Sequence, residues 1–270
     1  MTTNDIYTAD RAEELVRRHA RVAADVERLA RQTPPDVRDP SVPVELITVT
    51  KFFPVTDVQA LYDAGIRTFG ENRDQEAARK AGELREDPSD PPAWHYIGQL
   101  QSNKAKSVVK YATSVHSIDR ASIVTALGKA YRNAVSRCEN EEDAAPASLA
   151  RGGLECLIQV GLDDERATPG GASAGARGGA DSEEIERLAD LIAETEGLQL
   201  AGLMAVAPLG ADPSRAFEKL YELSRSLRRA HPDAWKISAG MSGDMSEAIR
   251  WGSTSVRVGS AIMGDRPKHT

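Results

Sequence analysis

A lysine and an arginine stand in two apolar, β-branched runs of the sequence. Lys51 ends the run at 44–50, and Arg257 lies within the run at 254–258. Burial lowers the pKa of a lysine amine, and a neutral amine can form a Schiff base with an aldehyde. The alternative for Lys51 is an ordinary surface lysine. Arg257 needs a partner, either a structural carboxylate or a ring nitrogen or phosphate of a ligand, because an unpaired charge in an apolar strand is costly.

The elements that would position these residues alternate along the chain. Short apolar runs predict strands at 44–50, 66–70, 94–97, 113–116, 154–162, 198–206, 235–238 and 254–258. Between them, helical patterns cover 55–64, 71–85, 102–110, 119–138, 182–196, 213–229 and 242–251. Alternation implies a parallel sheet, and eight units favour a single closed (β/α)8 TIM barrel over an open sheet.

An amphipathic helix is predicted at 10–31, ahead of the first strand. We therefore expect two parts, with residues 1–43 forming an N-terminal helix and connector and residues 44–270 forming the barrel. Two polar, small-residue segments at 139–151 and 169–180 interrupt the second half of the chain. The second is predicted to be a disordered insertion, with a lid as the alternative.

Two serines follow the last predicted strands, where barrels of this class commonly bind phosphate. Ser242 comes after strand seven, and Ser260 comes after strand eight. The first N–H groups of a helix have no backbone partner and can bind an anion, although each serine could be a plain helix cap. Together with Lys51, a phosphate site suits a phosphorylated aldehyde. Two ligands meet that description, a sugar-phosphate aldol substrate and pyridoxal 5′-phosphate (PLP).

Composition excludes several other classes of function. The chain has 270 residues and a net charge of −7, which argues against general affinity for nucleic acid or an anionic membrane. No apolar run approaches the roughly 20 residues of a membrane span. The two cysteines and five histidines show no disulfide framework or metal-ligand spacing. The first ten residues lack the pattern of a signal peptide. We expect a cytoplasmic monomer without a metal site.

Several ordered motifs then carry a resemblance to a known family. They include T-K-F-F-P at 50–54, F-G-E-N-R-D-Q-E at 69–76, W-H-Y-I-G-Q-L-Q-S-N-K at 94–104, S-A-G-M-S-G-D-M at 238–245 and G-S-T-S-V-R-V-G-S-A-I-M-G at 252–264. The chain resembles the YggS/PROSC family, the PLP homeostasis proteins, over residues 44–266. The resemblance implies a barrel like the N-terminal domain of alanine racemase, with PLP held as a Schiff base on Lys51.

The same resemblance assigns roles to further residues. Arg257 matches the arginine that faces the pyridine nitrogen, and Asn72 is expected near the cofactor. Ser242, Gly259 and Ser260 match the phosphate-binding positions, and Ser238 is assigned with them. The chain departs from the family at four places that bear on the pocket wall: Gly161, Ala239, Arg73 and the long loop at 170–180.

Two classes of function follow from the resemblance. The family implies a binding protein that holds PLP and hands it to PLP-dependent apo-enzymes, with no catalytic residue of its own. The alternative is an enzyme, a PLP-dependent amino-acid racemase or more remotely a Schiff-base aldolase. Racemisation needs an acid or base on each face of the substrate, and only His95 and Tyr96 could face Lys51. The sequence ends at Thr270 without the β-rich second domain of alanine racemase, so we expect a binding protein.

Overall fold

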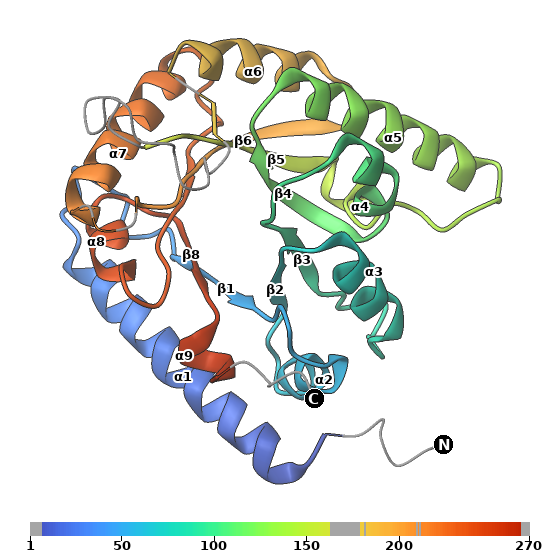
Figure 1. Cartoon of the computed structure of the whole chain (residues 1–270), viewed down its shortest axis with the longest axis horizontal. Coiled ribbons are helices and arrows are strands. Elements are labelled where there is room, and N and C mark those ends of the chain that lie inside the picture. The colour runs from blue at the N-terminus through green and yellow to red at the C-terminus, as the bar shows by residue number, and fades with distance from the viewer. Residues whose placement is uncertain (1–6, 163–178, 181, 209, 211, 266–270) are drawn as a thin grey trace.

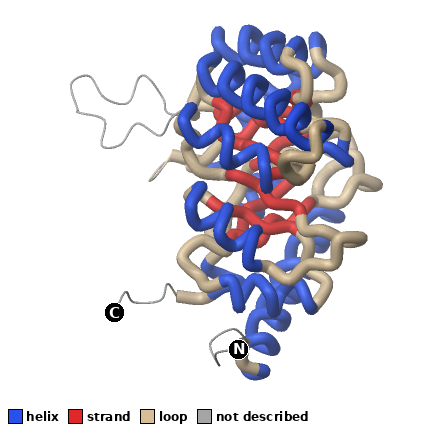
Figure 2. Tube along the Cα trace, turned by 90° about the vertical axis from the view of Figure 1, so that its right-hand side faces the viewer, coloured by secondary structure: helices blue, strands red, loops and turns tan. Residues whose placement is uncertain are grey.

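Eight parallel strands close into a barrel in the order of the sequence, with β8 returning to pair with β1. The structure is a computed structural model and describes residues 7–162, 179–180, 182–208, 210 and 212–265. Figures 1 and 2 show the strands at the centre and the helices around them. The strands are β1 (Glu45–Val49), β2 (Thr68–Glu71), β3 (Ala93–Tyr96), β4 (Ala112–Ile118), β5 (Leu154–Gln159), β6 (Leu198–Met204), β7 (Lys236–Ser238) and β8 (Ser255–Val258). The predicted TIM barrel is confirmed.

Helices follow the strands around the outside of the barrel. They are α1 (Ala9–Gln32), α2 (Val55–Asp63), α3 (Asp74–Glu83), α4 (Ala105–Tyr111), α5 (Ala121–Glu139), α6 (Ser182–Glu194), α7 (Pro213–Ala230), α8 (Met245–Arg250) and α9 (Ser260–Met263). Short 3-10 turns, η1 (Ser102–Lys104) and η2 (Leu149–Arg151), precede α4 and β5. In the described part of the chain, none of the helices combines the length and apolar character needed to cross a membrane.

The extra N-terminal helix is present as α1, which packs against α2, α8 and α9. Its apolar stripe, which includes Leu15 and Val22, is buried, as expected for an amphipathic helix on a globular core. Arg11 adds a polar link, since its Nη2 lies 2.7 Å from Oδ2 of Asp57 and 2.9 Å from the carbonyl oxygen of Met263. The helix therefore holds the first and last elements of the barrel together.

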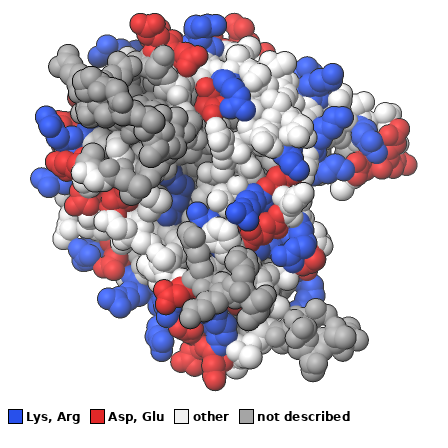
Figure 3. Space-filling model, viewed as in Figure 1, with Lys and Arg blue, Asp and Glu red and all other residues white. Residues whose placement is uncertain are grey.

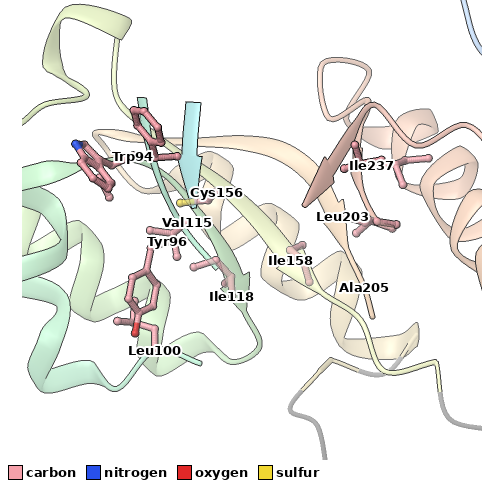
Figure 4. Close-up of a cluster of buried hydrophobic side chains, with 14 of the residues drawn as sticks. Trp94, Tyr96, Leu100, Val115, Ile118, Cys156, Ile158, Leu203, Ala205 and Ile237 are labelled. Atoms are coloured by element: carbon pink, nitrogen blue, oxygen red, sulfur yellow. The ribbon is translucent and has the colours of Figure 1, made fainter. Parts of the chain in front are cut away.

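The main apolar core lies between the strands and the surrounding helices. Figure 4 shows part of it, with Trp94, Val115 and Ile158 among the labelled side chains. A second, small apolar cluster is formed by Leu157, Ala201 and Met204. Strand side chains alternate between faces, so one set packs on the helices while the other fills the barrel. The side chains inside this barrel are largely polar, and they include residues that could take part in binding or catalysis.

Several predicted elements begin later than expected, and two helices show the physical reason. The helix predicted at 242–251 begins at Met245, because the carboxylate of Asp244 accepts a hydrogen bond from the N–H of Met241 at 2.6 Å and holds the chain in a turn. The helix predicted from residue 71 begins at Asp74, since Glu71 still belongs to β2. The segment at 169–180 lies outside the described residues except for its last two. There, Ala180 forms an isolated parallel bridge with Val160.

Candidate functional site

Four neighbouring strands, in the order β7, β8, β1 and β2, carry the residues singled out in the sequence. Their pairing is parallel, with Ser238 opposite Ser255, Thr48 opposite Val258 and Val49 opposite Gly70. The carboxyl ends of parallel strands meet on one rim. The segments that begin after these strands are therefore adjacent, although they are distant in sequence.

Lys51 lies two residues beyond the end of β1 and is partly buried. The preceding residue, Thr50, points outward, because its hydroxyl donates to Oε1 of Glu71 at 2.7 Å. Lys51 itself lies in the turn that follows, at the rim formed by the carboxyl ends of the strands. Its Nζ lies 5.9 Å from the centre of the Phe52 ring. The position suits an amine that must meet a ligand at the mouth of the barrel.

Arg257 is 5% exposed and lies inside the barrel. Its Nη1 donates to the carbonyl oxygen of Ser238 at 2.7 Å and to the Oγ of the same residue at 2.6 Å, and its Nη2 donates to the carbonyl oxygen of Ala205 at 2.9 Å. Among the described residues, none of its hydrogen bonds goes to a carboxylate. Desolvation lowers the pKa of Arg257 to about 10, which leaves it charged at neutral pH.

A chain of hydrogen bonds continues from Arg257 through the barrel. The Oγ of Ser238 lies 2.9 Å from Nδ1 of His116, and Nε2 of His116 lies 2.9 Å from Nδ1 of His95. Farther on, Nε2 of His95 is 3.9 Å from Oε1 of Glu45, at the start of β1. The four side chains Arg257, Ser238, His116 and His95 are called the barrel relay below.

The hydrogen bonds of the barrel relay can all be donated in one direction, from Arg257 toward His95, which gives each member a partner. Burial lowers the pKa of both histidines, that of His116 well below its usual value, so both are neutral. Arg257 can only donate, so the Ser238 hydroxyl accepts from it and donates to Nδ1 of His116. Nε2–H of His116 then donates to His95, whose own Nε2–H faces Glu45. The guanidinium thus sets the tautomer of each histidine along the chain.

The two predicted phosphate serines face each other across the rim. The Ser260 hydroxyl donates to Oγ of Ser242 at 3.3 Å, and both residues are exposed. Neither occupies an N-cap position, since α8 is preceded by Asp244 and α9 by Gly259. The reading of both serines as plain helix caps is therefore wrong. A Cβ on Gly259 would lie 3.4 Å from the carbonyl oxygen of Val49, in ordinary van der Waals contact with β1.

Asn72 follows β2 and has a buried acceptor. Within the described residues, its Oδ1 has no hydrogen-bond partner. Its backbone is packed closely against Gly98, where an added Cβ would lie 2.1 Å from the carbonyl oxygen of Asn72. A buried amide oxygen without a donor is costly, so this atom suits contact with a ligand or water.

Ser238, which was assigned to the phosphate group, is fully buried at the end of β7. Its hydroxyl is engaged by Arg257 and His116, as described above. The structure thus brings Ser238 together with Arg257, and Ser242 together with Ser260. Of the departures from the family pattern, Ala239 is buried, and Gly161 donates its N–H to the carbonyl oxygen of Ala180 at 3.2 Å.

Sequence reasoning missed a buried ion pair next to Lys51. Lys80 of α3 is fully buried, and its Nζ lies 2.6 Å from Oε1 of Glu71 and 2.7 Å from Oε1 of Glu76. The i, i+4 spacing of Glu76 and Lys80 was visible in the sequence, but such pairs usually lie on a solvated face. The role of His116 was also missed, because only the tertiary structure brings it beside Ser238.

Basic side chains are prominent near the centre of the face seen in Figure 3, where blue Lys and Arg atoms lie among white ones. The polar pocket next to Asn72 has a volume of about 500 Å³ and includes three cations, Arg73, Lys104 and Arg120. Two of these cations have carboxylate partners, because Lys104 lies 3.7 Å from Asp74 and Arg120 lies 2.6 Å from Asp119. The pocket therefore carries mixed charge.

Comparison with known proteins identifies the family and the fold. The sequence profile described as "Alanine racemase, N-terminal domain" matches residues 43–267. The pyridoxal phosphate homeostasis protein of Corynebacterium glutamicum is 40% identical over 228 residues, which cover 84% of this chain and 93% of that protein. The structure of PipY from Synechococcus elongatus with PLP bound is similar with a TM-score of 0.67 and 27% identity, covering 93% of this chain and 100% of PipY. A protein from Bifidobacterium adolescentis described as unknown gives a TM-score of 0.73 at 27% identity, covering 96% and 98%.

Proposed function

The chain belongs to the family of pyridoxal phosphate homeostasis proteins, and from this premise we propose that it binds PLP at the barrel rim and stores it without catalytic turnover. PipY, a structural relative, has been solved with PLP bound. In this proposal six residues surround the cofactor, and Ser238 contributes by holding Arg257. The six are Lys51, Asn72, Ser242, Arg257, Gly259 and Ser260.

The residues at the rim fit the groups that PLP presents. Its phosphate matches the facing hydroxyls of Ser242 and Ser260, together with the first N–H groups of α9. Gly259 directly precedes α9 beside these serines, and its lack of a side chain favours backbone contact with a ligand. Asn72 offers a buried acceptor without a partner among the described residues. Lys51 supplies a partly buried amine at the rim.

The observation that carries the proposal is the environment of Arg257, a buried cation whose hydrogen bonds within the described residues go only to neutral oxygens. When bound, PLP supplies an aldehyde for a Schiff base with an amine and a pyridine ring that can accept electrons. A cation next to the ring nitrogen disfavours its protonation, which weakens the ring as an electron acceptor. Arg257 thus favours storage over carbanion chemistry.

Racemase activity would need a second acid or base opposite Lys51, and neither candidate suits that role. His95 is buried inside the barrel relay, with one ring nitrogen bonded to His116 and the other directed toward Glu45. Tyr96 is buried, and desolvation raises the pKa of its hydroxyl to about 12, so almost none of it is in the phenolate form that could accept a proton at neutral pH. These two positions support a binding protein.

Reconstitution with PLP tests the proposal directly. The protein is mixed with PLP, reduced with borohydride and digested, and mass spectrometry locates the covalently attached pyridoxyl group. We expect the label on the peptide that contains Lys51 and a visible absorbance band before reduction. Lys51→Ala should lose both, whereas Lys106→Ala, which changes an exposed lysine of α4, should keep both. A wild-type protein that gains neither band nor label would overturn the proposal.

Turnover and partners call for separate measurements. We propose that the stored PLP passes to PLP-dependent apo-enzymes. Measuring the transfer of PLP from the loaded protein to an apo-aminotransferase would test this. Racemisation of D- or L-amino acids that is lost in Lys51→Ala would favour the enzyme instead. The division at residue 44 between helix and barrel, the monomeric state and the cytoplasmic location stay predictions.

A further inference from the structure

We infer that Lys80 and Glu76 are positioning residues for Lys51, because they clamp the two peptide groups on either side of it. This inference rests on the proposed role of Lys51 as the residue that attaches PLP. It concerns Lys80, Glu76 and Glu71, a buried group that is called the acid–lysine clamp below.

The clamp holds the backbone both before and after Lys51. The Nζ of Lys80 donates to the carbonyl oxygen of Thr50 at 2.8 Å. The N–H of Phe52 donates to Oε1 of Glu76 at 2.6 Å. A lysine side chain can swing through several ångströms about its own bonds, so the reach of its amine depends on how firmly its backbone is fixed. These two hydrogen bonds fix that backbone from α3.

The same group ties the ends of two strands to one helix. Oε1 of Glu71, at the end of β2, accepts from the Thr50 hydroxyl at 2.7 Å and from Lys80 at 2.6 Å. Lys80 also bonds Glu76 at 2.7 Å, one turn earlier in α3. The clamp therefore connects the end of β1, the end of β2 and the helix between β2 and β3. A shift of one of these elements would strain its hydrogen bonds to the other two.

The backbone that is held has an unfavourable conformation. Phe52 has a φ of 73°, in the left-handed region that a bulky residue rarely adopts. Such a conformation persists only where surrounding contacts enforce it, and it is common at ligand sites. The hydrogen bond to Glu76 falls on the N–H of that same residue. The clamp thus stabilises the turn that presents Lys51.

Stability alone does not account for this arrangement. Burying charged side chains costs desolvation energy, and apolar residues of similar volume are often at least as stabilising. Lys80 is fully buried and Glu71 is 1% exposed, so the cost applies in full. What the charges provide is a set of directional bonds to the two peptides beside Lys51, which apolar side chains cannot make.

The test compares two glutamates of the same helix. Glu76→Ala removes the acceptor of the Phe52 N–H, whereas Glu83→Ala removes an exposed glutamate paired with Arg79. The rate of PLP capture is followed by stopped-flow absorbance, and the Kd and the pH dependence of the visible band are measured on the same samples. We expect Glu76→Ala to slow capture or weaken binding by about tenfold or more and to shift the pH profile. Glu83→Ala should match wild type.

A conservative variant separates positioning from folding. Glu76→Gln keeps an oxygen that can accept from Phe52, so it should recover most of the rate, and circular dichroism should show native folding for every variant. If Glu76→Ala folds and matches wild type in rate, Kd and pH profile, the inference is wrong. If Glu76→Ala does not fold, Glu76→Gln and the double variant Lys80→Met/Glu71→Gln, which leaves no unpaired buried carboxylate at position 71, decide it by the same readouts. Failure of the wild type to bind PLP would instead overturn the proposed function.

Discussion

Removal of the buried cation of the acid–lysine clamp gives a sharp test of the energetics. Lys80→Met leaves Glu71 and Glu76 facing a methyl group, with Glu71 only 1% exposed. Breaking a buried ion pair by removing one partner typically costs about 3–5 kcal/mol, because a buried charge is left uncompensated. For a domain of this size that corresponds to a fall of roughly 6–20 °C in the midpoint of thermal unfolding.

The loss should depend on pH through Glu71. Burial raises the pKa of Glu71 in the folded protein, and Lys80 acts against that rise. Without Lys80 the folded pKa rises further above the unfolded value of 4.5. A carboxyl with a raised folded pKa stabilises the protein below its unfolded pKa, and this contribution is lost as the pH rises through the folded pKa. The free-energy difference between Lys80→Met and wild type should therefore be larger at pH 8 than at pH 5.

Urea unfolding at both pH values, followed by circular dichroism, measures this difference. Arg79→Met is the matched control, because its partner Glu83 is exposed and such surface pairs contribute about 0–1 kcal/mol. Adding Glu71→Gln to Lys80→Met should recover part of the loss. A Lys80→Met protein as stable as wild type at pH 8, or equally destabilised at both pH values, would refute the reasoning.

Three further outcomes are expected. Ser242→Ala and Ser260→Ala should each weaken PLP binding about 10- to 150-fold, since one hydrogen bond to a charged group contributes roughly 1.5–3 kcal/mol; an equal loss for pyridoxal, which lacks the phosphate, would contradict the assignment. His116→Phe should lower the free energy of unfolding by about 2–6 kcal/mol in urea, because two buried partners are left unsatisfied. The pKa of His116 in the folded wild type lies below 6.5, so the wild type should lose stability as the pH falls below that value. The stability of His116→Gln should fall less over the same pH range. A flat profile in wild type would count against neutral histidines. Gly98→Ala should lower the midpoint of thermal unfolding, because its Cβ would lie 2.1 Å from a backbone oxygen, whereas Gly82→Ala, in open space, should not; equal midpoints would contradict the close contact.

Much of the fold was predictable because each element has its own local pattern. Apolar runs such as 44–50 and helical patterns such as 213–229 correspond to β1 and α7 within one or two residues. Errors occur at helix starts, as at Met245, where the side chain of Asp244 turns the chain before the helix begins. Such a local contact competes with helix propensity, and periodicity does not reveal it.

The candidate site was predictable where chemistry and strand position coincide. Lys51 and Arg257 stand out because charged residues at or within apolar strands need a reason to be there. The sequence pattern did not distinguish Ser238, which bonds Arg257, from Ser242 and Ser260 on the rim. That distinction depends on which face of the barrel each side chain takes, and a strand of three residues gives too little pattern to show it.

By itself the sequence determined the alternation of elements, the order of the strands and the residues that could attach or bind a phosphorylated aldehyde. Only the tertiary structure decided their surroundings. Lys80 reads as an ordinary surface lysine on α3 until the closed barrel buries it between two carboxylates beside Lys51. His95 and His116 become a relay only when β3, β4 and β7 point them inward at Arg257 and Ser238. The physical reason is that burial and charge pairing depend on contacts between residues far apart in the chain, which local patterns do not encode.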